Sequence, residues 1–226
     1  MLKNKYLTKV CLALLLILFS MEVFQFLITV YAKIVIFRVE NYTVTEAETN
    51  FLEWFDEYSI LFIGCHFLVA FYFGIFYFIW LSRANFNFFL LGDKELTYNT
   101  LIVGWRFVII PIPIRIPIPI DNLWKPWKPY SAFKEIIAKS HQLAFGSVHN
   151  KKTEMILFMW WILFLISLLL WISLAKNLQS RELLNLILFL YIFEILKSIF
   201  LFYLIYNVDK WQRKANQSKP ISLQKS

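Results

Sequence analysis

The sequence predicts an all-α membrane protein with four transmembrane helices. The chain has 226 residues, and 59% of them are hydrophobic, which is more apolar surface than a soluble domain of this length needs. Crossing a bilayer core of about 30 Å takes roughly 20 helical residues, and four apolar stretches reach that length. These predicted spans are residues 10–32, 58–81, 155–175 and 183–206.

The distribution of basic residues predicts the topology. The 23 Lys and Arg residues fall mainly in the amino-terminal end, in the 82–154 connection and in the tail. Only Lys33, Arg38, Lys176 and Arg181 lie on the opposite side. By the positive-inside rule, both termini and the 82–154 connection are expected in the cytoplasm. An anionic inner leaflet accounts for the basic excess, so no nucleic-acid partner is expected.

The first span holds Glu22 near its middle. Small residues at Val30–Ala32 are compatible with signal-peptide cleavage. However, the apolar run of about 22 residues is longer than the 7–15 of a signal core, so we expect the first span to be retained.

The second span is preceded by a helix start signal. Thr45 followed by Glu48 fits a capping box and predicts a helix from near Glu46. We interpret this segment as a helical extension at the membrane surface, and a cation-attracting mouth is the alternative. Its acidic residues are Glu40, Glu46, Glu48, Glu53, Asp56 and Glu57.

The 82–154 connection contains a proline-rich segment, PIPIRIPIPI, at residues 111–120. Proline fixes its own φ and restricts the residue before it, so a helix is excluded and an extended or polyproline II backbone is expected. Its unpaired carbonyls could not face lipid tails. We expect an interfacial or re-entrant strap with Arg115 reaching phosphate or water; a plain cytoplasmic linker is the alternative.

An aromatic and basic segment follows the prolines. Tryptophans beside lysines are typical of a membrane-interface anchor. From Pro129 the pattern predicts an amphipathic helix lying in the inner interface. The anchor comprises Trp124, Lys125, Trp127 and Lys128, and the apolar face of the helix comprises Phe133, Ile136, Ile137, Leu143 and Ala144.

The last two spans are joined by a loop of a few residues, so they are expected to be antiparallel neighbours. We treat residues 1–209 as one transmembrane domain and 210–226 as a polar cytoplasmic tail, with disorder expected from Lys214 onward.

Four ionisable residues lie inside predicted spans, where such groups are costly and usually face the bundle interior. They are Glu22, His66, Glu194 and Lys197. Glu194 and Lys197 are three apart and are able to pair on one helix; Glu22 is within reach of Lys197 from a neighbouring helix. The set is interpreted first as polar contacts between helices. Alternatives are a proton or ion path through Glu22, His66 and Glu194, or an assembly surface for another membrane subunit.

No motif for a catalytic centre, phosphate loop or metal site is present, so we predict a non-enzymatic protein without cofactor or metal.

A set of short motifs resembles a family of small bacterial membrane proteins catalogued only as a domain of unknown function. The motifs occur in order over about residues 75–165. They are WLSRANFN (80–87), LG (91–92), GW (104–105), NLWKP (122–126), KEI (134–136) and WW (160–161). The resemblance implies the architecture and a bacterial inner-membrane location, but no activity. It also marks Arg83 and Asn87, which are expected either to mark the inner membrane boundary or to tie the second span to the proline strap.

The sequence therefore predicts a membrane module that binds anionic lipid or a partner protein through an aromatic-basic cytoplasmic face. The partner would be lipid headgroups, another membrane protein or a second copy of the chain. The alternative is a small transporter or channel component that uses the buried charges. The face comprises Arg83, Asn87, Arg115, Asn122, Trp124, Lys125, Trp127 and Lys128.

Overall fold

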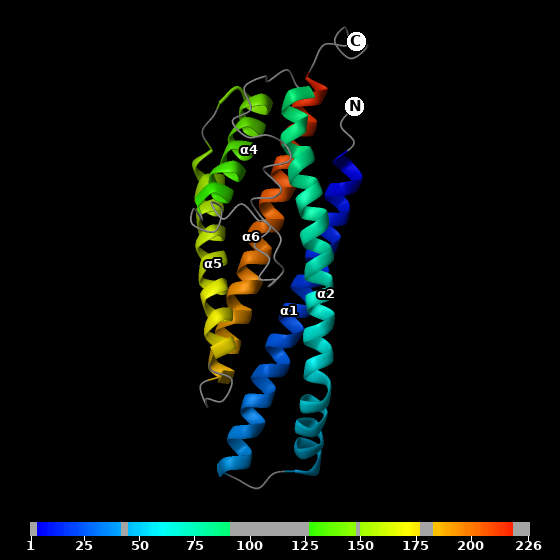
Figure 1. The fold of residues 1–226 in the computed structure, drawn as a ribbon, viewed down its shortest axis with the longest axis vertical. Helices are drawn as coiled ribbons and strands as arrows, with labels where there is room; N and C mark the ends of the chain where they lie inside the picture. The colour runs from blue at the N-terminus through cyan, green and yellow to red at the C-terminus, as the bar shows by residue number, and fades with distance from the viewer. Residues whose placement is uncertain (1–3, 42–44, 91–126, 148–149, 177–182, 219–226) are drawn as a thin grey trace, which may run out of the picture. The chain divides into compact units, whose positions relative to one another are not determined.

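The structure is a computed structural model that describes residues 4–41, 45–90, 127–147, 150–176 and 183–218. Within these ranges it is all-helical (Figure 1). The helices are α1 (Asn4–Asn41), α2 (Glu46–Leu90), α4 (Trp127–Phe145), α5 (Lys151–Lys176) and α6 (Leu183–Gln217). Helices α1, α2, α5 and α6 are long and apolar enough to cross a membrane, which confirms the predicted multi-pass class. The proline segment lies outside the described residues.

The start of α2 confirms the predicted capping box. The Thr45 amide donates to Glu48 Oε2 at 3.0 Å, and the Glu48 amide donates back to Thr45 Oγ1 at 3.4 Å. Helix α2 then continues for 45 residues, about 68 Å at 1.5 Å per residue. It is therefore about twice as long as the bilayer core is thick.

The end of α6 differs from the expected tail. We expected a polar tail from residue 210 and disorder from Lys214, but α6 continues to Gln217. The physical reason is a buried stripe with helical spacing that runs past the membrane span. Val208, Gln212 and Ala215 are buried on it although Lys210 and Lys214, on either side of Gln212, are exposed.

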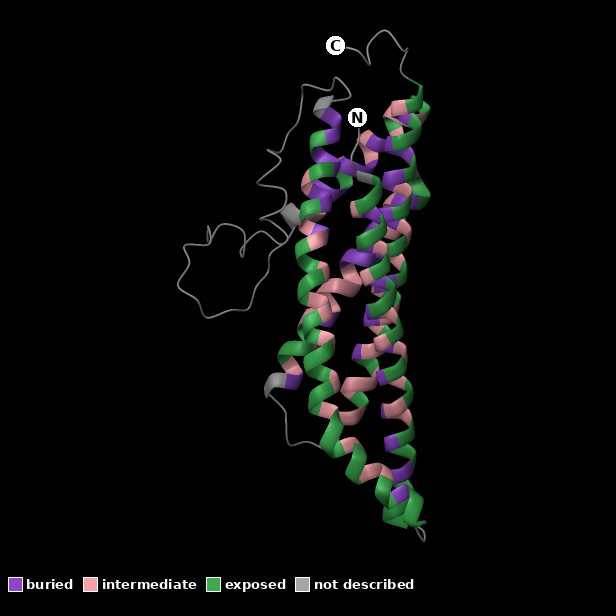
Figure 2. Cartoon of the chain, turned by 90° about the vertical axis from the view of Figure 1, so that its right-hand side faces the viewer, coloured by how far each residue is buried: buried purple, intermediate pink, exposed green. Residues whose placement is uncertain are grey.

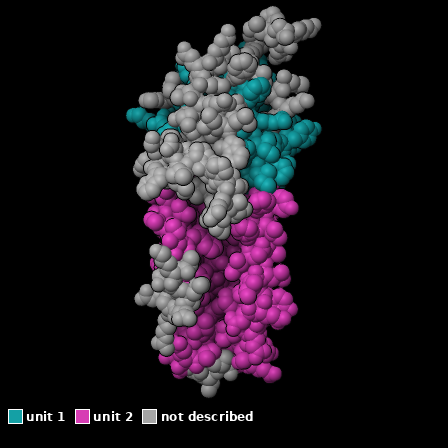
Figure 3. Space-filling model, in the orientation of Figure 1, with its two compact units in different colours: residues 1–13, 73–159, 200–226 teal, residues 14–72, 160–199 magenta. Residues whose placement is uncertain are grey.

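The chain divides into two compact units (Figure 3). Unit 1 comprises residues 1–13, 73–159 and 200–226, and unit 2 comprises residues 14–72 and 160–199.

In unit 1, the apolar face of α4 is covered by protein. The Phe133 ring meets Tyr77 and Trp80 of α2 edge-on, at centroid distances of 6.3 and 6.4 Å. Ile136 and Ile137 are also buried. We expected this face to lie against the membrane interface. An amphipathic pattern shows only that one face must be buried, and here much of that face packs on protein.

In unit 2, α1 runs antiparallel to α2 and to α6. Tyr31 and Phe24 of α1 contact Phe51 and Phe62 of α2, respectively, so the numbering rises in one helix as it falls in the other. Lys33 of α1 donates a hydrogen bond to Asn185 at the start of α6. No residue in the most apolar stretch of α2 is fully buried, which suits a helix that faces lipid (Figure 2).

Candidate functional site

The buried stripe of α1 carries several polar residues within unit 2. Its buried residues recur every three or four positions, which is the spacing of a helix face that packs against other helices. Glu22, Gln25 and Thr29 lie on this stripe between apolar residues, so their polar side chains are buried between helices. The stripe is Leu15, Leu18, Glu22, Gln25, Thr29, Ala32 and Val35.

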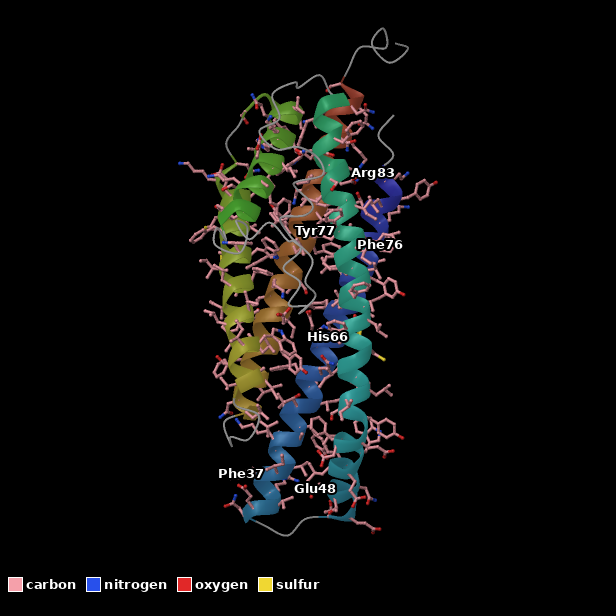
Figure 4. The ribbon with its side chains drawn as sticks, viewed as in Figure 1. Phe37, Glu48, His66, Phe76, Tyr77 and Arg83 are labelled. Atoms are coloured by element: carbon pink, nitrogen blue, oxygen red, sulfur yellow. The ribbon has the colours of Figure 1, made fainter. Side chains whose placement is uncertain are left out.

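Glu22 is the centre of this polar group, and its residue surface is only 2% exposed. The Ser198 hydroxyl of α6 lies 2.9 Å from Glu22 Oε2 and 3.3 Å from Oε1, and it donates to this carboxylate. His66 Nε2 of α2 lies 3.9 Å from Glu22 Oε1, beyond hydrogen-bond distance. Figure 4 shows His66 on its helix. Side chains from α1, α2 and α6 thus meet at one buried carboxylate.

Gln25 lies one turn beyond Glu22 on the same face of α1. It is 7% exposed, and its side-chain oxygen Oε1 is buried without a hydrogen-bond partner in the described part of the chain. The nearby Thr29 hydroxyl donates to the main-chain oxygen of Gln25 at 2.7 Å. Because that bond goes to the main-chain oxygen, it does not provide a donor for the side-chain oxygen of Gln25.

Glu194 and Lys197 form an ion pair within α6. Glu194 precedes Ser198 by four positions, so it shares a helix face with the residue that contacts Glu22. The Lys197 ammonium group pairs with the Glu194 carboxylate, and no ion pair between Lys197 and Glu22 is present among the described residues. Of the four predicted buried ionisable residues, Glu194 and Lys197 thus form an ion pair, whereas Glu22 and His66 make a longer contact of 3.9 Å.

At the α1–α2 turn, Arg38 Nη1 lies 2.7 Å from Glu48 Oε1. Glu48 therefore accepts bonds from the Thr45 amide and from Arg38 at once. Phe37 and Glu48 are labelled in Figure 4. This acid ties the end of α1 to the start of α2.

In unit 1, Gln212 joins three helices. Its Nε2 donates to the Ala84 main-chain oxygen at 2.9 Å and to Ser140 Oγ at 3.3 Å. Its Oε1 accepts a bond of 2.8 Å from Asn87 Nδ2. Helices α2, α4 and α6 are therefore tied together by one amide. Sequence analysis missed Gln212, and its place on the buried stripe of α6 was the available signal.

A second network in unit 1 surrounds Asp209. The Thr8 hydroxyl donates to Asp209 Oδ1 at 2.9 Å, and Trp80 Nε1 donates to Thr8 Oγ1 at 3.1 Å. Arg213 Nη2 lies 2.7 Å from Asp209 Oδ2. Both carboxylate oxygens of Asp209 therefore have a partner.

The predicted aromatic-basic face is described only in part. Asn87 is buried and bonded to Gln212, while Arg83 on the same helix is exposed (Figure 4). Trp127 and Lys128 begin α4, but their side chains lie outside the described part. Four further residues of the face lie wholly outside the described residues: Arg115, Asn122, Trp124 and Lys125.

The described part of unit 1 is rich in exposed basic residues. Its acids are Glu135, Glu154 and Asp209, and each forms an ion pair with a base, namely Lys139, Lys134 and Arg213, respectively. The surplus is therefore positive. The exposed bases are Lys5, Lys9, Arg83, Lys134, Lys151, Lys152, Lys210, Arg213 and Lys214.

No group of three or more His, Cys, Asp or Glu side chains able to hold a metal ion occurs among the described residues. No curated protein and no solved structure is significantly similar to the chain. The model of one family, DUF4328, a domain of unknown function, matches residues 45–208. This match extends beyond the stretch over which the short motifs were recognised, and it covers well over half of the chain. The protein belongs to the DUF4328 family.

Proposed function

We propose that this protein is a membrane module that binds anionic lipid headgroups at the cytoplasmic side. The observation that supports the proposal is the positive surplus of unit 1, where each described acid is already paired with a base. Each Lys or Arg near an anionic leaflet contributes about 1 kcal/mol to the attraction. Several such residues on one side of the membrane therefore make a strong preference for acidic headgroups.

The charge of unit 2 supports the same orientation. Its described acids outnumber its bases, and most of them lie in the first turns of α2. Lipid headgroups of negative charge are repelled there and attracted at unit 1. Trp124 and Trp127, which the sequence places beside Lys125 and Lys128, would add aromatic anchoring at the same interface.

The test is native mass spectrometry of the full chain from micelles that contain phosphatidylglycerol or phosphatidylcholine. Wild-type protein should retain more phosphatidylglycerol than phosphatidylcholine. The double variant Lys151→Gln/Lys152→Gln should lose about 2 kcal/mol of this preference, or roughly 30-fold in relative affinity. Trp124→Ala/Trp127→Ala should weaken the retention of both lipids.

The matched control is Lys33→Gln/Lys176→Gln, which removes two lysines from the other predicted side of the membrane. It should leave the lipid preference unchanged. Equal losses in the two double variants would show that overall charge, and not the cytoplasmic basic surface, sets the preference. Co-purification of a stoichiometric protein in place of lipid would favour partner binding over this proposal.

A second candidate function is that of a small transporter or channel component for a cation. The observation that favours it is Glu22, an ionisable residue that is 2% exposed inside a predicted span and contacted by side chains from two other helices. Intramembrane carboxylates commonly mark ion paths. Cation flux into vesicles should be lost in Glu22→Gln and in Glu194→Gln, and an unaffected flux in both variants would remove this candidate.

A further inference from the structure

We propose that Glu22, Gln25 and Ser198 form a binding site within unit 2 for one monovalent alkali cation, for which sodium is the probe. The inference rests on the second candidate function, because the same residues would lie on the ion path, and it adds the charge and class of the ion. Equilibrium binding requires no flux, so the two ideas are able to fail separately.

The first argument is an excess of acceptors. A carboxylate offers about four lone-pair positions. Among the described residues, the Ser198 hydroxyl, with a single proton, is the one hydrogen-bond donor to Glu22. Gln25 adds a buried amide oxygen that has no donor at all in the described part. Burying such acceptors without partners is unfavourable, so the group requires something positive.

The second argument is the charge. On α6, Glu194 and Lys197 cancel each other in their ion pair. The part of α5 within unit 2 has no ionisable residue before Lys176 at its end. From α2 the imidazole of His66 approaches, but it makes no hydrogen bond to the carboxylate. Among the described residues, no basic group therefore lies within hydrogen-bond distance of the Glu22 carboxylate, and one monovalent cation would supply the missing counter-charge.

The third argument is the kind of ligand. Carboxylate, amide and hydroxyl oxygens are hard donors that suit alkali and alkaline-earth cations rather than transition metals. A divalent ion would leave the cluster with a surplus positive charge inside the membrane, where uncompensated charge is unfavourable.

The three proposed ligands also lie close together before any ion binds. Glu22 and Gln25 are three residues apart on one continuous helix, so their side chains are neighbours without any rearrangement of the chain. Ser198 approaches from α6 and already contacts the carboxylate. Buried ligands on rigid helices lose little conformational freedom when an ion binds.

The experiment is equilibrium binding of radioactive sodium to the purified full chain by scintillation proximity. Wild type should bind about one sodium per chain, and binding should saturate. Glu22→Gln should bind at least tenfold more weakly. Gln25→Leu should also weaken binding, because it replaces the amide oxygen with an apolar side chain of similar size. Ser20→Ala is the matched control for Ser198→Ala: the Ser20 hydroxyl bonds to the Leu16 oxygen of its own helix, so its loss should leave binding unchanged.

A second measurement requires no variant. Dicyclohexylcarbodiimide modifies buried carboxylic acids, and sodium bound at Glu22 should protect that residue. At a sodium concentration ten times Kd, modification of Glu22 should be slowed about tenfold relative to choline chloride of equal ionic strength.

Two results would overturn the inference. One is a monodisperse wild-type protein that binds no saturable sodium and whose Glu22 is modified equally fast in sodium and choline. The other is saturable binding that is the same in wild type and Glu22→Gln, which would place the ion elsewhere. Sodium binding without flux would remove the second candidate function and keep the site.

Discussion

The polar networks of unit 1 and the polar cluster of unit 2 are built from similar residues, yet their hydrogen-bond balance differs. In unit 1, Gln212 uses both its oxygen and its nitrogen, and both oxygens of Asp209 have partners. In unit 2, Glu22 has a single described donor, and the Gln25 oxygen has none. Satisfied polar groups stabilise a helix bundle, whereas an excess of acceptors indicates a place for a ligand.

The two units also differ in charge. The described surface of unit 1 is basic, and the described charges of unit 2 are mainly acidic. In the two proposals, the same chain presents basic side chains to anionic headgroups in unit 1 and oxygen acceptors to a cation in unit 2. The net charge alone therefore does not describe this protein, because its described basic residues are concentrated in unit 1 and most of its described acidic residues lie in unit 2.

The largest expected effect is that of Gln212→Ala. The substitution leaves the buried Ala84 oxygen, Ser140 and Asn87 without this partner, so we expect a loss of about 3 kcal/mol in the free energy of unfolding. Equilibrium unfolding in mixed micelles measures it. The matched control is Gln217→Ala, which removes an exposed glutamine from the same helix and should change the stability by less than about 0.5 kcal/mol. Similar losses in both variants would mean that the unit 1 network is not structural.

The next effect is that of Asp209→Ala, which removes the acceptor of Thr8 and the partner of Arg213. We expect a loss of about 2 kcal/mol in the free energy of unfolding. Most of it should come from the buried Thr8 bond, because Arg213 is half-exposed and such ion pairs contribute at most about 1 kcal/mol. Arg213→Gln measured in the same way separates the two contributions, and a larger loss in Arg213→Gln than in Asp209→Ala would contradict this division.

A smaller effect is expected at a satisfied polar group of unit 2. Thr45→Ala removes the hydroxyl that caps α2, which should destabilise the first turn of the helix by about 1 kcal/mol. Hydrogen exchange of the amides at residues 46–49 measures this opening, with Ser59→Ala farther along α2 as the control. Unchanged exchange would show that the Arg38–Glu48 contact alone holds the turn.

The sequence predicted what local patterns encode. The apolar lengths indicated the four long helices, and Thr45 with Glu48 indicated the start of α2. It did not predict the pairing of Asn87 with Gln212, because residues 125 positions apart leave no local signal of contact. The extension of α6 was missed because lysines and arginines on its exposed face hid a buried stripe. The sequence also could not predict what covers the apolar face of α4, because an amphipathic helix is compatible with either lipid or protein as its cover.

The sodium dependence of thermal stability tests the contrast between the two units most directly. An ion that binds only the folded protein stabilises it by about 2.7 kcal/mol at one hundred times Kd. Replacing choline chloride with sodium chloride at equal ionic strength should therefore raise the Tm of wild type. The same increase should appear in Gln212→Ala from a lower baseline and should be absent in Glu22→Gln. An increase of equal size in all three proteins, or in none, would contradict the account.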